Sequence, residues 1–331
     1  MSEYGQAATY PSRSLDPLDL DNLTLTVMEI PSDFHDIVGS YATRERQEIV
    51  VDPDFLIRTG KKRRSHIRLQ STTTGLYSLY TIAQTAKMPT PTTIYMTATG
   101  PNCIGLSGSD LPFTVTTTSS TIRNDITHEY AQANGETYEQ LIDSSSVGNR
   151  NVISIAWHGG DFERPCPEMA QEFLDTVLLS GSVGATCWHA WSYGDSESIV
   201  PANYKWHITA VDVYPPDWPL LNTIADRKYD YSISFHGQAG TAEIDVGGLQ
   251  SNAEKANVVS FLQGVVSPNI TVEIVDEEAI FGASQRNILN RLTSNYGVSA
   301  SIQLEMTFDV RAASSSLIAQ AMAHYYKNNY L

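Results

Sequence analysis

The sequence has little of what would tie a protein to a membrane, a secretion route or a disulfide framework. No apolar run approaches the ~20 residues that a transmembrane helix needs. The opening segment MSEYGQAATYPSRSLDPLDLD lacks the basic stretch and apolar core of a signal peptide. The three cysteines, Cys103, Cys166 and Cys187, are an odd number without C-x-x-C spacing. We therefore expect reduced thiols, no cysteine-held zinc and no membrane insertion.

Basic residues are also scarce. Lys and Arg number 21 against 37 Asp and Glu, which gives a net charge of -16, and only seven residues are Lys. This balance argues against nucleic acid as a partner, because phosphates require a basic face. The one basic cluster, GKKRR at residues 60–64, is interpreted as an exposed turn. The acidic, lysine-poor composition is typical of proteins from high-salt hosts, and an ordinary acidic cytoplasmic protein is the alternative.

Composition divides the chain into three parts. Residues 1–55 are rich in Asp, Pro and Ser without a sustained period, which predicts an extended arm that docks on its own domain or on a neighbouring subunit. Residues 56–124 contain short Thr- and Tyr-rich alternating runs between turns, which predict a small antiparallel β-rich region. Residues 125–331 alternate between strand-like and helix-like patterns, which predicts an α/β domain.

The expected elements of the α/β domain follow from apolar periodicity. Alternation of this kind predicts a mixed, largely parallel sheet sandwiched by helices, with the functional site at the carboxyl ends of the strands. We expect strands at residues 152–157, 185–193, 206–211, 229–236, 242–249, 271–276 and 301–306, and helices at 167–180, 219–225, 252–265, 284–292 and 312–326.

Three of these strands end in a polar side chain, a pattern that core packing does not require. The first runs into HGGDFE, a glycine turn that can bring His158 and Glu163 to one point. The others end in FHG, with His236, and in IQLE, with Glu305. Two histidines and a carboxylate are ligands that a catalytic zinc uses, with a fourth position left for water. For His158 taken alone, a turn with a surface histidine is the alternative.

As a set, the motifs resemble those of the phage-type poly-γ-glutamate hydrolases, a family similar in fold to the zinc carboxypeptidases. HGGDFE, WHIT (206–209), FHG, VGGL (246–249), NILNR (287–291) and IQLE follow the family's order over about residues 125–331. The resemblance implies that His158, Glu163 and His236 hold Zn²⁺. It further implies that Glu305 acts as general base and then as general acid.

The metal loop departs from the family pattern. Asp161 and Phe162 stand where HGGGIE has glycine and an aliphatic residue, and Trp157 stands where the family usually has proline. Arg164, Pro165 and Cys166 replace a Pro-Gly-Thr run. These changes make the loop more crowded than the family's.

The resemblance also implies how substrate is held. A γ-glutamyl polymer is a polyanion, so cationic side chains are expected to bind its carboxylates, and Arg164, Arg291 and Arg311 are the candidates by position. His207, in WHIT, either lines the pocket or orients a metal ligand, or it is a partly buried structural histidine.

The function that this reasoning predicts is zinc-dependent hydrolysis of γ-glutamyl amide bonds in poly-γ-glutamate or a related host surface polymer. The protein would be a virus-associated capsule depolymerase, found in the virion or in the host cytoplasm before release. The alternative is a structural or host-adhesion virion protein built on an inherited hydrolase fold. In either case the N-terminal arm predicts a homo-oligomer or contacts between virion subunits.

Overall fold

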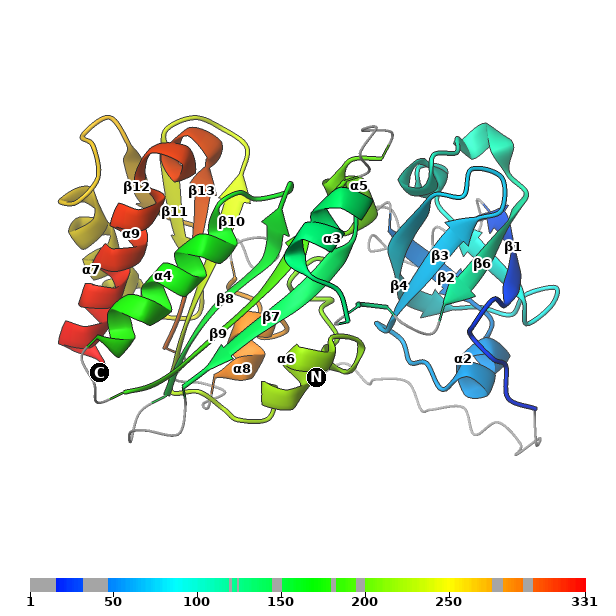
Figure 1. Cartoon of the computed structure of the whole chain (residues 1–331), viewed down its shortest axis with the longest axis horizontal. Helices are drawn as coiled ribbons and strands as arrows, with labels where there is room; N and C mark the ends of the chain where they lie inside the picture. The colour runs from blue at the N-terminus through cyan, green and yellow to red at the C-terminus, as the bar shows by residue number, and fades with distance from the viewer. Residues whose placement is uncertain are drawn as a thin grey trace.

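The computed structural model describes residues 16–31, 47–118, 121–123, 125–144, 151–179, 183–194, 200–275, 282–293 and 300–331. These residues form two units that lie side by side, a closed β-barrel and a larger α/β unit (Figure 1). Within these ranges, no helix is both long and apolar enough to cross a bilayer.

The barrel has six strands in the order β1-β5-β2-β4-β3-β6. Two pairs, β1 with β5 and β2 with β4, are parallel, and the remaining pairs are antiparallel. Leu25, Ile49, Ile67 and Ile94 fill the interior, because alternate residues of a closed sheet point inward. The elements are β1 (Thr24–Glu29), β2 (Glu48–Val51), α2 (Pro53–Thr59), β3 (His66–Ser71), β4 (Tyr77–Thr85), β5 (Thr93–Met96), η3 (Gly100–Ile104), η4 (Gly108–Asp110) and β6 (Phe113–Thr118).

The prediction of an extended arm at residues 1–55 is wrong for the part of it that the structure describes. Strands β1 and β2 and the fully buried Phe55 belong to the barrel core. The expected small antiparallel unit is accordingly a mixed barrel, closed by strands from the supposed arm. The two buried apolar residues in β1, Leu25 and Val27, are too few to show a period, and their partners lie about seventy to ninety residues further along the chain. Residues 1–15 and 32–46 lie outside the described ranges.

The α/β unit contains a seven-stranded sheet in the order β12-β11-β13-β10-β8-β9-β7. Four neighbouring pairs are parallel, and β11–β13 and β7–β9 are antiparallel. The predicted mixed, largely parallel sheet is therefore confirmed. Its strands are β7 (Thr137–Asp143), β8 (Asn151–Gly160), β9 (Gly184–Ser192), β10 (Tyr231–Gln238), β11 (Glu243–Gly247), β12 (Thr271–Ile274) and β13 (Ala300–Thr307).

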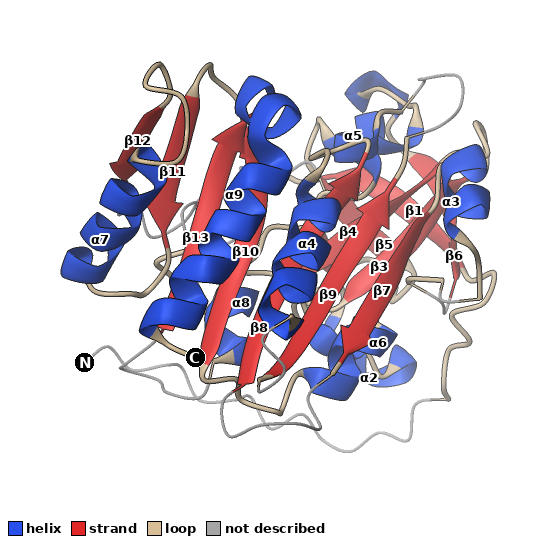
Figure 2. Cartoon of the chain, turned by 60° about the vertical axis from the view of Figure 1, so that its left-hand side comes forward, coloured by secondary structure: helices blue, strands red, loops and turns tan. Residues whose placement is uncertain are grey.

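Helices cover both faces of this sheet, as predicted. One face packs against α4 (Cys166–Leu178), α7 (Asn252–Gln263) and α9 (Phe308–Asn329), which lie in front of the strands in Figure 2. The opposite face packs against α6 (Pro219–Ile224) and α8 (Ile288–Leu292). The remaining short elements are α3 (His128–Asn134), α5 (Ala202–Lys205) and η5 (Pro215–Asp217). The strand expected at residues 206–211 is absent: Trp206 and Ile208 are buried in the core, but the backbone there is not in a strand.

Side chains alternate between the two faces of the sheet along β10 and β13, and this alternation shows which face carries the candidate site residues. Ile233 and Phe235 of β10 join the core beneath α4 and α9, as do Ile302 and Leu304 of β13. The residues that alternate with these core residues, including His236 and Glu305, therefore point to the other face, which α8 covers. Because β8, β10 and β13 are parallel, their carboxyl ends meet at one edge of the sheet.

Buried polar contacts join the barrel to the α/β unit. Lys61 Nζ lies 2.8 Å from Asp217 Oδ1, and the backbone N–H of His66 donates to Asp217 Oδ2 at 2.6 Å. Arg68 donates to both carboxylate oxygens of Glu136, at 3.2 and 2.9 Å. The side chains of this second pair are each 9 % exposed, so the contact is shielded from solvent.

Candidate active site

A tight turn at the end of β8 brings His158 and Glu163 together. The backbone N–H of Glu163 donates to the carbonyl of His158 at 2.8 Å, and α4 begins three residues later. Gly160 has φ of 74°, and a Cβ added there would lie 2.2 Å from the carbonyl oxygen of Ser192. The second glycine of HGG is therefore required both by the backbone conformation and by the close approach of β9.

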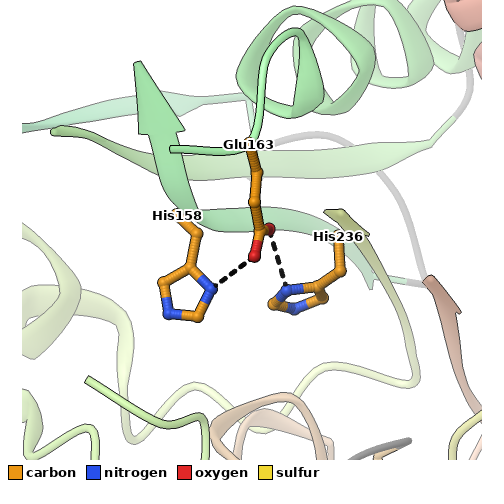
Figure 3. A group of neighbouring side chains, drawn as sticks. All are labelled: His158, Glu163 and His236. Carbon is orange, nitrogen blue, oxygen red and sulfur yellow. Dashed lines mark hydrogen bonds and ion pairs between the residues drawn. The ribbon is translucent and has the colours of Figure 1, made fainter. Parts of the chain in front are cut away.

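The end of β10 completes a cluster of three buried side chains. His158 Nδ1 lies 2.9 Å from Glu163 Oε1, and His236 Nδ1 lies 3.2 Å from Glu163 Oε2 (Figure 3). One donor atom from each residue lies within 4.8 Å of the others. The fold thus brings the three residues proposed as metal ligands to one point, although His236 comes from a strand far along the chain.

The hydrogen-bonding pattern suits a metal ion at this point. His158 Nε2 faces the carbonyl oxygen of Ile208 at 2.9 Å, and because a carbonyl can only accept, Nε2 carries the proton. In a neutral ring, Nδ1 then presents its lone pair to the Glu163 carboxylate, and two acceptors 2.9 Å apart repel unless a proton or a cation lies between them. Ligand atoms around a tetrahedral zinc are roughly 3.3 Å apart, close to the spacings observed here.

The electrostatics of the cluster agree with this assignment. Burial alone would raise the pKa of Glu163, but the imidazoles of His158 and His236 outweigh it and hold that pKa below its ordinary value. Burial would lower the pKa of His236, but the carboxylates of Glu305 and Glu163 raise it above its ordinary value. The raised pKa of His236 means that an incoming cation would compete with a proton for this ring.

Glu305 lies on β13 beside the cluster. It is in register with His236 across the parallel pair β10–β13, and with Asp245 across the antiparallel pair β11–β13. Gln303 Nε2 donates to Glu305 Oε1 at 2.6 Å. Burial, together with the charges of Glu163 and Asp245, raises the pKa of Glu305 to about 8, although His236 and Gln303 act in the opposite direction. Such a carboxyl group can both take up and release a proton near neutral pH.

These shifts predict how the stability of the zinc-free protein depends on pH. His236 contributes stability below its ordinary pKa of 6.5 that is lost as pH rises through its raised folded value. The raised pKa of Glu305 has the same sign, because the folded state binds more protons than the unfolded state between about pH 4.5 and 8. Glu163 has a lowered pKa, so it stabilises the folded state above its ordinary pKa of 4.5. That stabilisation is lost as pH falls below 4.5.

In the presence of chelator, the melting temperature should therefore be highest near pH 4.5 to 5 and fall toward pH 8. Differential scanning calorimetry across this range measures the effect. Glu305→Gln, which removes one of the titrating groups, should flatten the decline. A zinc-free melting temperature that rises from pH 6 to 8 would contradict this linkage.

Of the three arginines proposed to bind substrate, Arg311 lies at a pocket. The pocket has a volume of about 610 Å³, and Asp161, Phe162, Glu163 and Gln238 are among its lining residues. The Arg311 side chain is buried and donates to the carbonyls of Met306 at 3.1 Å and Arg164 at 2.7 Å. It forms no ion pair with any side chain in the described ranges, so its charge is available to an anionic ligand.

The other candidates occupy different positions. Arg164 donates to the carbonyl of Gly160 and pairs with Asp161 at the surface, where it braces the metal loop. Arg291 donates to the carbonyl of Val213 and does not line the pocket. His207 does not line it either; its ring centroid lies 4.9 Å from that of His158 and 5.2 Å from that of Phe162. The geometry therefore favours Arg311 over the other two arginines.

Sequence reasoning missed three groups that neighbour the site residues. Gln303 had a readable signal, because residues two apart on a strand share a face and IQLE contains both Gln303 and Glu305. Asp245 could be placed beside Glu305 only once the β11–β13 register was known. The Ile208 carbonyl, which orients His158, is a backbone group and leaves no trace in residue type.

A family model described as poly-gamma-glutamate hydrolase matches residues 127–324. The chain belongs to this family. The match covers the described site residues and excludes the barrel, and family membership supports a hydrolase. No curated protein is similar enough to this chain to be matched to it.

Solved structures similar to the chain include a bacteriophage poly-gamma-glutamate hydrolase, at 19 % identity and a TM-score of 0.39, over 61 % of this chain and 95 % of that one. A metallo-carboxypeptidase from Burkholderia cenocepacia is 12 % identical with a TM-score of 0.36, over 65 % of this chain and 72 % of that one. A metallo-carboxypeptidase from Pseudomonas aeruginosa is 12 % identical with a TM-score of 0.36, over 57 % and 59 % of the two chains.

Substitutions at two glycines can distinguish the cost of a positive φ from the cost of a steric clash with a neighbouring strand. Gly160→Ala should lower stability by about 1 to 3 kcal/mol and weaken zinc binding, because both the positive φ and the Ser192 carbonyl oppose a Cβ. Gly75→Ala is the matched control: its φ is 73°, but a Cβ there would meet nothing within 4 Å. Denaturant unfolding and zinc titration of both variants measure the difference. Equal zinc affinity in wild type and Gly160→Ala would show that the turn does not position the cluster.

Proposed function

We propose that the protein is a zinc-dependent hydrolase that cleaves γ-glutamyl amide bonds in poly-γ-glutamate or a related polymer. The observation that carries the proposal is the convergence of His158, Glu163 and His236 beside Glu305, whose raised pKa suits proton transfer. Membership of the poly-γ-glutamate hydrolase family supports the same reaction class.

In this proposal each site residue has a separate task. His158 and His236 would hold the ion through Nδ1, and Glu163 through its carboxylate. When bound, zinc would supply Lewis acidity that polarises a carbonyl and acidifies water. Glu305 would accept the proton of the attacking water and then pass it to the nitrogen of the leaving amine. Because Gln303 occupies Oε1, the proton would be carried on Oε2.

Arg311 would hold a carboxylate of the substrate. Each γ-linked glutamate keeps a free α-carboxylate, and a guanidinium can bind such a group through two parallel hydrogen bonds. Two of the Arg311 donors are directed at backbone carbonyls, which fixes the side chain before substrate arrives. A buried cation without a carboxylate partner strongly favours an anionic ligand over a neutral one.

The proposal extends to a virus-associated role in clearing a capsule-like coat. The barrel supports it, since its strands β1 to β6 form a closed unit outside the segment that matches the hydrolase family. Such a unit could anchor the hydrolase to a virion or to the host surface.

The function is tested by assaying purified protein on poly-γ-glutamate with zinc, after chelation, and after zinc is restored. We expect chain shortening only when zinc is present, and no cleavage of α-linked polyglutamate, which has the same charge but a different amide linkage. Arg311→Met should raise KM for the γ-linked polymer while leaving bound zinc unchanged. Cleavage that persists without metal, or that is equal on both polymers, would overturn the proposal.

A further inference from the structure

We infer that Asn287 and Gln303 are positioning residues for Glu305. Together the three form an amide relay, Asn287–Gln303–Glu305, whose hydrogen bonds run in one fixed direction and end on a single oxygen of the carboxylate. The relay deepens the proposed function and rests on it, because positioning Glu305 matters to the reaction only if Glu305 is the general base.

The direction of the relay is set at the start of α8. Asn287 caps this helix, and its Oδ1 accepts a hydrogen bond from the backbone N–H of Leu289 at 2.9 Å. A backbone N–H can only donate, so the orientation of the Asn287 amide is determined. Its Nδ2 therefore points away from the helix and donates to Gln303 Oε1 at 3.0 Å.

The same logic fixes the second amide. Because Gln303 Oε1 accepts from Asn287, Gln303 Nε2 faces Glu305 and donates to its Oε1 at 2.6 Å. An ionised carboxylate can only accept, so a donor at one end and an acceptor at the other leave a single arrangement for all three bonds. Glu305 Oε1 is held by a short, charge-assisted bond, and Oε2 remains to take a proton.

Burial protects the relay from competition by water. Asn287 is 2 % exposed, Gln303 1 % and Glu305 7 %. The relay also has a rigid base, since α8 is attached to β13 by a second contact, in which Ser301 Oγ and Asn290 Oδ1 are 2.5 Å apart. The Glu305 carboxylate is thereby held in position relative to both α8 and β13. It cannot rotate without breaking its buried hydrogen bond to Gln303.

A purely structural role would not require these residue types. On the same face of the sheet, β8 presents Ile153 and Ile155, which pack against apolar residues. Buried amides stabilise less than well-packed apolar side chains unless every polar atom is bonded, and an incomplete network is destabilising. The amides that continue the polar line from the helix cap to Glu305 are therefore explained by what they do to that carboxylate.

Asn287→Asp tests the relay with little change in shape. Aspartate is as good a helix cap as asparagine, but it replaces the Nδ2 donor with a second acceptor. Gln303 Nε2 is then drawn toward the new carboxylate and away from Glu305. We expect kcat to fall on the order of 10-fold, with KM within about twofold and zinc stoichiometry unchanged.

Two further variants distinguish the loss of the hydrogen-bond donor from the added charge and from a change in side-chain packing. Asn287→Ser keeps a good cap and adds no charge, so it should lower kcat less than Asn287→Asp. Gln303→Met keeps the length of the side chain and removes its donor, so it should lower kcat by an amount similar to Asn287→Asp. A residue that only supports the fold would change the melting temperature in these variants and leave kcat of the folded protein unaltered.

A measurement that does not depend on activity uses the side-chain amide of Gln303 in the zinc-free protein. Its Nε2 protons should give an NMR signal that is protected from exchange, identified by its loss in Gln303→Met, and that protection should fall in Asn287→Asp. Wild-type protein without hydrolase activity would overturn the proposed function. An active wild type whose Asn287→Asp and Gln303→Met variants keep kcat within twofold, or an unprotected Gln303 amide, would overturn the relay alone.

Discussion

Glu305→Gln should lower kcat for γ-glutamyl hydrolysis by about 10² to 10⁴-fold, the usual contribution of a positioned general acid–base. Glutamine keeps the shape of the side chain and can still pair with Gln303, but it cannot accept the proton of an attacking water. The raised pKa of Glu305 results from its burial and from the nearby charges of Glu163 and Asp245. Single-turnover rates on poly-γ-glutamate, with zinc content measured in parallel, test this expectation.

The matched control is Glu243→Gln, the same chemical change on the neighbouring strand β11, where Glu243 is exposed. It should retain wild-type rates and zinc content. Loss of zinc in Glu305→Gln would make Glu305 a ligand and not a base. Equal rates in wild type and Glu305→Gln would remove Glu305 from the chemistry.

The site could be located from sequence because its geometry follows from a general property of parallel sheets. Strands that run in the same direction bring their carboxyl ends to one edge, so polar residues that end β8, β10 and β13 meet whatever their separation in the chain. HGG and FHG lie at or next to the carboxyl ends of β8 and β10. No comparable rule orients a short helix, so the sequence could not show that Arg291, on α8, turns toward the Val213 carbonyl and away from the pocket.

The barrel escaped prediction for the opposite reason. Its closure depends on the parallel pairing of β1 with β5, and only two residues of β1, Leu25 and Val27, are buried apolar residues. A segment of that composition is predicted to be an extended arm, because the apolar residues against which it packs come from strands distant in sequence. A deletion of residues 1–50 would therefore remove β1 and three of the four residues of β2, and it would test folding of the barrel before it tested assembly.

Removing a metal ligand should have the largest effect of all. His236→Ala should abolish stoichiometric zinc binding and reduce hydrolysis to the chelated level, because the remaining pair, His158 and Glu163, offers too few ligands for a catalytic zinc site. In wild type, zinc at 100 times its dissociation constant should stabilise the folded protein by about 2.7 kcal/mol, and this stabilisation should vanish in the variant.

Zinc titration followed by the melting temperature and by metal analysis measures both effects. His324→Ala is the matched control, since His324 lies exposed on α9 and should leave the zinc response intact. The zinc response of wild type should also grow as pH rises from 6 to 8, because the cluster must release its proton before the cation enters. A His236→Ala protein that still binds one zinc tightly and gains the same stability would show that the ion is held elsewhere, and the assignment of His158, Glu163 and His236 as its ligands would fail.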